Sequence, residues 1–276
     1  MAVNYLSPHL FVKWQKIVIF VVNIYIVVKD IKINQFINYF KNSNRITKSD
    51  IWEYFRKTEK GITENTLKWR IHNLKKENVI KSIGRGIYAI TDKTAYKPEP
   101  DNLIKKASKI FLSRYDEINY CVWNSSWLYD FMIHQPFTSF YVFEVEKEVC
   151  KETFNLFKDE SLNAFYQPNE DLIDNYVSDS KNAIIVKPLI SRSPINIVKN
   201  VKLASVEKIL VDIYCDQDIY PVFNLSEQVN IFENMTDSYI VNFSKLISYS
   251  KRRNREEALK AFINNNFDNL LNDILQ

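Results

Sequence analysis

Glu144, Glu146 and Lys147 are the residues whose types and spacing come closest to a catalytic motif. They follow the (D/E)xK pattern of nucleases, in which carboxylates hold a metal ion and the lysine polarises a phosphate. The tripeptide is common by chance, and no aspartate at the end of an earlier predicted strand completes a metal site. Residues 101–276 contain no glycine, which excludes glycine-dependent phosphate loops, dinucleotide fingerprints and nucleophile elbows. We therefore expect no catalytic residues and no enzyme activity, with a metal-dependent nuclease as the alternative.

A second charged group, Glu207, Lys208 and Asp212, falls on one predicted helix that begins after Ser205. A lysine and an aspartate four residues apart on a helix can form an ion pair. Such pairing on a partly exposed face accounts for these residues without a catalytic role. Residues 251–255, which are rich in lysine and arginine, fit either a patch for a phosphate or a partner, or a solvated helix end.

Polar and cationic residues on the predicted helix that opens at Thr63 suit nucleic-acid recognition. Its buried stripe comprises Leu67, Ile71 and Leu74. The residues opposite and beside that stripe are Asn65, Thr66, Lys68, Trp69, His72, Asn73 and Lys76. Asparagine and threonine suit base edges, and the cations Lys68, Lys76 and Arg85 suit phosphates. Trp69 would pack on the sugar-phosphate backbone or against the linker, and a protein-interaction module is the alternative to DNA binding.

Arg85 lies between two of the three glycines of the chain, in the segment Ile83-Gly84-Arg85-Gly86-Ile87-Tyr88. Because glycine is otherwise almost eliminated, the surviving pair predicts a tight turn with positive φ. Apolar runs at residues 79–83 and 87–90 predict two short strands joined by a Gly-Arg-Gly tip. A hairpin with a basic tip directly after a helix is how a winged helix-turn-helix ends, and any surface hairpin with a solvated arginine is the alternative.

Two further helices are predicted upstream. The apolar residues of the first recur at helical spacing and are Ile33, Phe36, Ile37 and Phe40. Thr47, with Asp50 three positions on, predicts the capped start of the second. Its buried side comprises Ile51, Tyr54 and Phe55. Three helices and a terminal hairpin predict a winged helix-turn-helix over residues 32–92.

Basic residues concentrate towards the start of the chain, whose net charge is +4. Residues 1–100 hold 18 Lys and Arg against 8 Asp and Glu, whereas residues 101–276 hold 19 against 25. A basic front and an acidic rear indicate a nucleic-acid module attached to a part that does not bind polyanions. A chance difference in charge between two domains is the alternative.

Cysteine and histidine give no sign of a disulfide framework or a metal site. Cys121, Cys150 and Cys215 are odd in number and share no close spacing, and the three histidines are isolated. We expect no metal, no cofactor and a cytoplasmic protein. Residues 17–28 are strongly apolar but fewer than the roughly 20 needed to span a bilayer. We interpret residues 1–31 as an apolar N-terminal extension, with membrane association and a misplaced start as alternatives.

The rest of the sequence predicts a linker at residues 93–100 and a second domain at residues 101–276. Helices are predicted at residues 101–114, 148–157 and 206–213, and from residue 225 onwards. Strands are predicted at residues 120–123, 140–145 and 183–186, the last buried on both faces. The predicted class is α+β, with an N-terminal winged helix-turn-helix followed by a larger mixed α/β domain with a helical C-terminal tail.

Several segments, in this order, resemble the AbiEi-type antitoxins of type IV abortive-infection toxin–antitoxin systems. They are the predicted winged helix closing on GRGIY, the linker, and the segments YCVWNSSWL from Tyr120, FEVEK from Phe143, SRSP from Ser191 and VEKILVDI from Val206. The resemblance covers about residues 32–255 and rests on diffuse motifs rather than a catalytic signature.

The resemblance implies a winged helix that binds inverted repeats in the protein's own promoter, on double-stranded DNA, and represses the operon. It also implies a second domain that counteracts a nucleotidyltransferase-like toxin without forming a stable complex. The DNA-contacting helix and wing would then include Asn65, Thr66, Lys68 and Arg85. The matching motif positions of the second domain are Ser191, Arg192, Glu207, Lys208 and Asp212.

Overall fold

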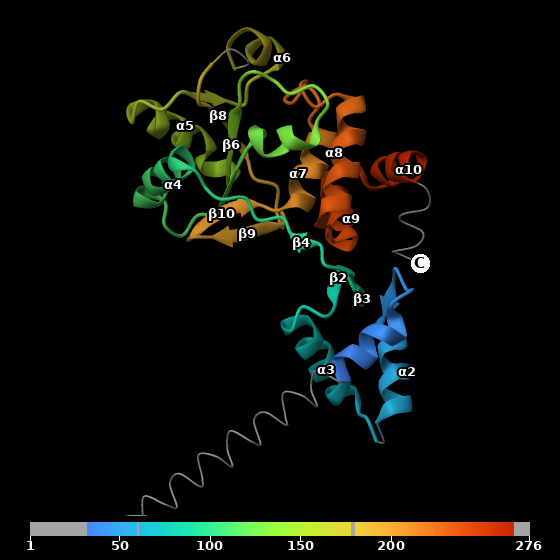
Figure 1. The fold of residues 1–276 in the computed structure, drawn as a ribbon. Coiled ribbons are helices and arrows are strands. Elements are labelled where there is room, and N and C mark those ends of the chain that lie inside the picture. Colours follow the sequence, from blue (N-terminus) through green and yellow to red (C-terminus); the bar gives the residue numbers. More distant parts are fainter. Residues whose placement is uncertain (1–31, 60, 178–179, 268–276) are drawn as a thin grey trace, which may run out of the picture. The chain divides into compact units, whose positions relative to one another are not determined.

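The computed structural model describes residues 32–59, 61–177 and 180–267, and it divides into two compact units (Figure 1). Within the described ranges, the first unit comprises residues 32–82 and 86–91, and the second comprises residues 83–85 and 92–267. The fold is of mixed α+β class, as predicted. The expected apolar extension at residues 1–31 lies outside the described residues.

The first unit consists of short helices and a small sheet. Residues 32–40 are helical and are followed by β1 (Ile46–Thr47), α2 (Lys48–Thr58) and α3 (Glu64–Lys76). Strands β2 (Lys81–Gly84) and β3 (Ile87–Ala89) follow, in a three-stranded sheet of order β1-β3-β2, although the last two residues of β2 are grouped with the second unit. The helices begin where the sequence predicts, because Thr47 and Asp50 form a reciprocal capping box and the Thr63 hydroxyl accepts the N–H of Thr66.

The apolar stripes of these helices form one core. Phe36, Tyr54 and Phe55 pack ring to ring, with the centroids of Phe36 and Tyr54 5.1 Å apart. Leu67, Ile71 and Leu74 of α3 are buried against them, as the helical spacing predicts. The core thereby fixes which side of α3 faces outward.

The turn between β2 and β3 consists of Arg85 and Gly86. Gly86 has φ +74°, in the left-handed region that favours glycine, and nothing near it would obstruct a side chain. Gly84 does not share this conformation and ends strand β2 as a buried residue. The prediction of positive φ is therefore confirmed for Gly86 and wrong for Gly84.

The second unit is built on a six-stranded mixed sheet of order β7-β8-β6-β5-β10-β9. Its strands are β5 (Tyr120–Asn124), β6 (Phe140–Val145), β7 (Ala164–Tyr166), β8 (Ala183–Pro188), β9 (Ile195–Val198) and β10 (Val201–Ala204). β6 runs parallel to β8 and antiparallel to β5. The predicted strands are present, and the apolar residues of β8 are buried on both faces.

Helices cover both faces of this sheet. One face packs on α4 (Asn102–Arg114) and α5 (Cys150–Asp159), which follows a short 3₁₀ turn (Lys147–Val149). The other face packs on α7 (Val206–Cys215), α8 (Leu225–Ser238), α9 (Phe243–Arg252) and α10 (Glu256–Asn266). Shorter elements are a 3₁₀ helix (Ser125–Phe131), α6 (Glu170–Leu172) and a short π-helix (Ile173–Val177). Alternating residues of β5, β6 and β8 therefore point towards either α4 and α5 or α7.

Residues 93–100, expected to be a linker, pack within the second unit instead. Within them, β4 (Thr94–Ala95) pairs in parallel with β11 (Tyr239–Ile240). The Tyr96 hydroxyl donates to the Trp127 carbonyl at 2.9 Å, and its ring packs on Tyr239. The two prolines at the end of this segment suggested a linker, but the pairing with β11 could not be seen in the local sequence.

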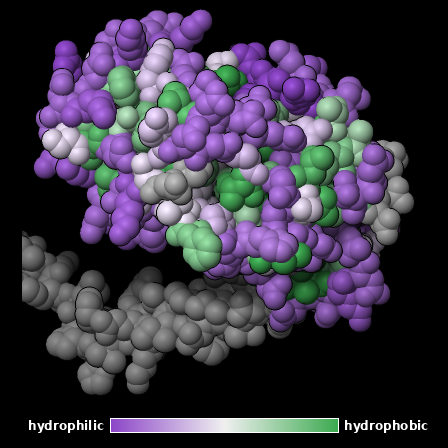
Figure 2. All heavy atoms as spheres, turned by 90° about the horizontal axis from the view of Figure 1, so that it is seen from above, coloured by the Kyte–Doolittle hydropathy of each residue, from purple (hydrophilic) through white to green (hydrophobic). Residues whose placement is uncertain are grey.

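Among the helices of residues 32–267 that the structure describes, none has both the length and the apolar composition needed to cross a bilayer. Figure 2 shows a face on which hydrophilic side chains predominate and apolar side chains form small, separate clusters. This face therefore lacks the wide apolar patch that marks an extensive interface.

Candidate functional site

The outward side of α3 carries most of the residues that the sequence predicts to contact DNA. Asn65, Lys68, His72 and Lys76 are exposed, and Trp69 keeps 54% of its surface exposed. Asn65 and Lys76 form no side-chain hydrogen bond or ion pair with any other described residue. Their polar groups are therefore available to a ligand.

Glu64 gathers two cations at the start of α3. Its carboxylate lies 3.1 Å from Lys48 Nζ and 3.7 Å from Lys68 Nζ. The hydrogen bond from Lys48, followed by the charge of Lys68, lowers the pKa of Glu64 below its usual value. Thr66 is also engaged, because its hydroxyl lies 2.9 Å from the Thr63 hydroxyl. Lys68 and Thr66 are therefore less free to contact a ligand than Asn65 and Lys76.

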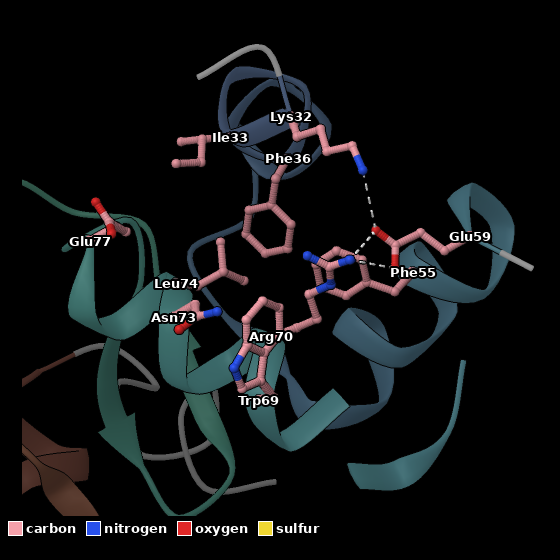
Figure 3. Close-up of a pocket in the computed structure, with 10 residues that line it drawn as sticks. All are labelled: Lys32, Ile33, Phe36, Phe55, Glu59, Trp69, Arg70, Asn73, Leu74 and Glu77. Atoms are coloured by element: carbon pink, nitrogen blue, oxygen red, sulfur yellow. Dashed lines mark hydrogen bonds and ion pairs between the residues drawn. The ribbon is translucent and has the colours of Figure 1, made fainter. Parts of the chain in front are cut away.

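Trp69 and Asn73, two of the predicted contact residues, line a pocket of about 180 Å³ (Figure 3). Its walls come from the helix at residues 32–40, from the end of α2 and from α3. Arg70 lies in this wall, and its Nη2 donates to both carboxylate oxygens of Glu59 at 2.8 and 2.9 Å. No local sequence pattern indicated this pocket, because Glu59, the C-cap of α2, and Arg70 of α3 are 11 residues apart.

Arg85, the last of the predicted contact residues, is exposed at the β2–β3 turn. The carbonyl of the adjacent Gly86 accepts the N–H of Lys48 at 2.9 Å, which ties the turn to the first residue of α2. The arginine is thus presented on a turn whose backbone is held in place.

In the second unit, the charged residues of α7 belong to a buried ion network. Lys208 is fully buried and lies between Asp212, one turn along α7, and Glu144 of β6. Glu144 and Asp212 are also fully buried. The prediction that Glu207, Lys208 and Asp212 lie on a partly exposed face is therefore wrong, although the i, i+4 pair itself is confirmed.

The network continues from these residues towards the surface. Lys187 of β8 lies 3.6 Å from Glu144 and 2.5 Å from Asp216, at the end of α7. Arg253, which caps α9, donates to Asp212 at 2.7 Å and also to Asp216. Three cations therefore meet three carboxylates, and the buried charges balance.

The pKa values in the network reflect the competition between burial and charge. Burial alone would lower the pKa of Lys208, but Asp212 and Glu144 hold it well above its usual value. For Asp216, burial raises the pKa, but Lys187 and Arg253 outweigh burial and leave the pKa below its usual value. For Glu144, burial outweighs the effect of Lys208, and the pKa is raised.

Two tyrosines add hydrogen bonds to the network. Tyr249 of α9 donates to Asp212 Oδ1 at 2.8 Å, and Lys187 donates to the Tyr220 hydroxyl at 3.3 Å. Lys187 and Asp216 were not predicted from the sequence, and Arg253 was expected in a binding patch or at a solvated helix end, whereas its side chain is 12% exposed and pairs with Asp212 and Asp216. A signal was present, because Glu144 and Lys187 each interrupt a buried apolar strand, where a single charge requires a partner.

The residues of the nuclease-like motif are not brought together. Glu144 is enclosed by the network, while Glu146 Oε1 accepts the backbone N–H of Asn119 at 3.2 Å. Lys147 is exposed in the following 3₁₀ turn. Within residues 32–267 as described, no three His, Cys, Asp or Glu residues are arranged to hold a metal ion.

A family model described as a family of unknown function, DUF6577, matches residues 66–269, which is more than half of the chain. The chain belongs to the DUF6577 family. The match begins inside α3 and includes the hairpin and every residue of the buried ion network. A comparison with curated proteins found no match.

The DUF6577 chain presents Ser191 and Arg192 at the surface. Both are exposed in a turn before β9, and Arg192 has φ +59°, in the left-handed region. Arg252 of α9 donates to the Ser191 hydroxyl. Of the five motif positions in the second unit, these two face solvent and Glu207, Lys208 and Asp212 are buried.

Glu207 has a separate structural role in the DUF6577 chain. Its carboxylate accepts the Ser205 hydroxyl at 2.5 Å and the Asn242 backbone N–H at 3.0 Å. Asn242 is the N-cap of α9, so Glu207 joins the beginnings of α7 and α9.

Proposed function

We propose that this DUF6577 protein is a DNA-binding transcriptional regulator whose first unit is a winged helix. The order of its elements supports this: a helix, β1, α2, α3 and the β2–β3 hairpin, with the sheet order β1-β3-β2. In such a module, the helix before the hairpin enters the major groove and the hairpin is the wing. Residues 32–91 hold 13 Lys and Arg against 5 Asp and Glu, a balance of +8 that favours a polyanion.

The observation that carries the proposal is the outward side of α3. Asn65 and Lys76 are exposed and unengaged among the described residues, at opposite ends of the helix. An asparagine amide reads adenine through paired hydrogen bonds, and a lysine neutralises a phosphate. Arg85 at the hairpin turn would add a second phosphate contact.

The finer function that we propose is that of a cytoplasmic antitoxin. The protein would repress its own operon by binding inverted repeats in the promoter. Its second unit would counteract a nucleotidyltransferase-like toxin without a stable complex. The resemblance of the motif segments to AbiEi-type antitoxins supports this. Burial of Lys208 and Asp212 indicates that these two motif residues maintain the fold, which leaves Ser191 and Arg192 for contact with a partner.

The geometry argues against the nuclease alternative. Glu144 is fully buried and lies against Lys208 and Lys187, so it offers no oxygen to a metal at the surface. We therefore propose a non-enzymatic protein. Incubation with plasmid DNA and Mg²⁺ or Mn²⁺ tests this, and cleavage that is lost in the variant Glu146→Gln would overturn it.

The proposed DNA binding is tested by fluorescence anisotropy with the labelled DNA that lies upstream of the gene. We expect salt-sensitive binding, with a salt slope that falls by about 1 in Lys76→Ala and in Arg85→Ala. Lys57→Ala is the matched control, because Lys57 is an exposed lysine of α2 outside the proposed contact face. A folded protein that does not bind this DNA at low salt would refute the proposal.

The antitoxin role has a separate test in cells. The gene is co-expressed with a neighbouring nucleotidyltransferase-like gene, and growth is compared for the native chain and for Arg192→Ala. We expect the native chain to restore growth and the variant to restore it less. Growth arrest that the native chain does not relieve would contradict the antitoxin role and leave the DNA-binding proposal intact.

A further inference from the structure

The pocket of the first unit has a size and a lining that fit a small ligand (Figure 3). Its volume is about 180 Å³, and an apolar cavity of about 150 Å³ holds one benzene ring. Phe36 and Leu74 supply buried apolar walls, and the indole of Trp69 supplies a flat, half-exposed one. The pocket therefore has room for one aromatic ring with a short substituent.

One end of the pocket is cationic. Arg70 Nη2 is bonded to Glu59, and Lys32 Nζ lies 3.8 Å from the same carboxylate. Two cations thus share one carboxylate, which leaves one positive charge in excess. The guanidinium of Arg70 lies 5.1 Å from the Trp69 ring centroid and 5.6 Å from the Phe55 ring centroid. A cation is therefore held directly against the aromatic walls.

Arg70 also retains hydrogen-bonding capacity. Guanidinium has five N–H donors, and the bonds to Glu59 use only Nη2. The Nε of Arg70 is buried and has no hydrogen-bond partner among the described residues. A buried donor without a partner costs free energy, which a ligand that reorganises the arginine can recover.

We propose that this pocket binds a small aromatic carboxylate and that the bound ligand weakens DNA binding. The ring would lie between Trp69 and Leu74, and the carboxylate would accept hydrogen bonds from Arg70 and Lys32. Figure 3 places Glu77 on the side of the pocket away from Lys32. The negative charge of Glu77 would repel the ligand carboxylate if the ligand were bound the other way round. The regulatory half of this proposal rests on the proposed function.

Two residues connect the pocket with the proposed DNA-binding face. Trp69 and Asn73 line the pocket and also belong to the set of α3 residues predicted to contact DNA. A ligand packed on Trp69 would hold the indole in place, and its carboxylate would add a negative charge beside a helix that approaches phosphates. Both effects disfavour DNA, and by linkage DNA would weaken ligand binding by the same factor.

Ligand binding is tested on the full chain without DNA, by titrating salicylate and following tryptophan fluorescence. The contribution of Trp69 is obtained by difference from Trp69→Phe. We expect saturable quenching with a Kd of about 0.1–1 mM, which is reasonable for about ten heavy atoms. Salicylamide, a neutral analogue, should bind more weakly. A Trp69 signal that does not respond in a chain with native circular dichroism would overturn the proposal, as would equal binding of the two compounds.

Variants of the cationic end separate binding from folding. Lys32→Ala removes an exposed ammonium and should weaken salicylate binding about two- to fivefold. Lys41→Ala is the matched control, since Lys41 is exposed just after the same helix and does not line the pocket. Glu59→Gln removes the competing carboxylate and should strengthen binding. A loss of salicylate affinity in a folded Glu59→Gln chain would contradict the assigned role of the cations.

The regulatory half is tested by anisotropy with the labelled upstream DNA, with and without saturating salicylate. We expect the DNA Kd to rise about three- to tenfold in the native chain and less in Lys32→Ala at the same salicylate concentration. Quenching of Trp69 by salicylate in a chain that does not bind DNA would refute the proposed function and support the proposed ligand site. DNA binding without quenching would refute the pocket alone. Binding of both with no coupling would refute the regulatory half.

Discussion

Two lysine–carboxylate pairs in this chain have the same i, i+4 spacing on a helix but differ in their burial. Lys68 pairs with Glu64 on α3, and Lys208 pairs with Asp212 on α7, each across one helical turn. Both side chains of the first pair are 63% exposed, whereas both of the second are fully buried. The same local pattern therefore serves a solvated surface in one unit and the interior of the other.

The difference in burial determines what each pair can do. An exposed pair is screened by water and salt and contributes about 0–1 kcal/mol, so a phosphate can replace the carboxylate at little cost. A buried pair has lost its hydration, and removing one member leaves an uncompensated charge. The pair on α3 is therefore free to change partners, and the pair on α7 requires its complete set of partners.

The largest loss of stability is expected from the substitution Lys208→Met. The substitution keeps the approximate length of the side chain but leaves Glu144 and Asp212 with one cation fewer in the interior. We expect a loss of about 3–5 kcal/mol in the free energy of unfolding, measured by urea denaturation. Lys68→Met is the matched control and should change stability by less than about 0.5 kcal/mol. Equal losses in the two variants would remove the distinction between the pairs.

A smaller loss is expected from Arg253→Lys. Arg253 bridges Asp212 and Asp216 with two different nitrogens, and a lysine keeps the charge but cannot reproduce the fork. Loss of one hydrogen bond to a charged group should cost about 1.5–3 kcal/mol in urea denaturation. Arg252→Lys, at the exposed neighbouring position, should be close to neutral. A neutral Arg253→Lys would show that the bridge does not contribute to stability.

Sequence patterns predicted the helices and strands better than they predicted the surroundings of the charged residues. The caps at Thr47 and Thr63 and the buried stripe of α3 are local features, set by residues within one or two turns, and the structure confirms them. The network around Lys208 depends on β6, β8 and α9, which the chain order does not bring together. For that reason, the i, i+4 spacing predicted the pair of Lys208 and Asp212 correctly but predicted the burial of these residues wrongly.

The same limit applies to the second unit's boundary and to the pocket. Two prolines suggested a linker at residues 93–100, yet β4 pairs with β11 more than 140 residues later. The pocket depends on Glu59 meeting Arg70, and on Lys32 from a third helical segment. Contacts between separate elements decide both features, and a single sequence does not encode them in any local pattern.

Acid should weaken the buried network through Asp216. Its pKa is lower in the folded chain than in the unfolded one, because Lys187 and Arg253 outweigh its burial. Its contribution to stability is thus complete above the unfolded pKa of about 3.9 and is lost as the pH falls through the folded value. The stability difference between the native chain and Asp216→Asn should shrink below about pH 4 in urea denaturation. Asp218→Asn, at an exposed neighbouring position, should show a smaller difference, and a gap for Asp216→Asn that is constant with pH would contradict the assignment.

The smallest effect on stability, and the one most specific to function, is expected at Glu64. In the free chain its carboxylate occupies Lys48 and Lys68, so these lysines must release it before they can contact phosphates. Glu64→Gln removes that competition and should strengthen DNA binding about two- to fivefold in anisotropy, with little change in stability. Glu53→Gln is the matched control, because Glu53 is an exposed acid of α2 that forms no ion pair with another described residue. If both variants strengthen DNA binding equally, the gain in affinity reflects net charge alone. A gain that is specific to Glu64→Gln would show that Lys68 of the exposed pair exchanges its carboxylate for a DNA phosphate. The buried pair on α7 cannot make such an exchange.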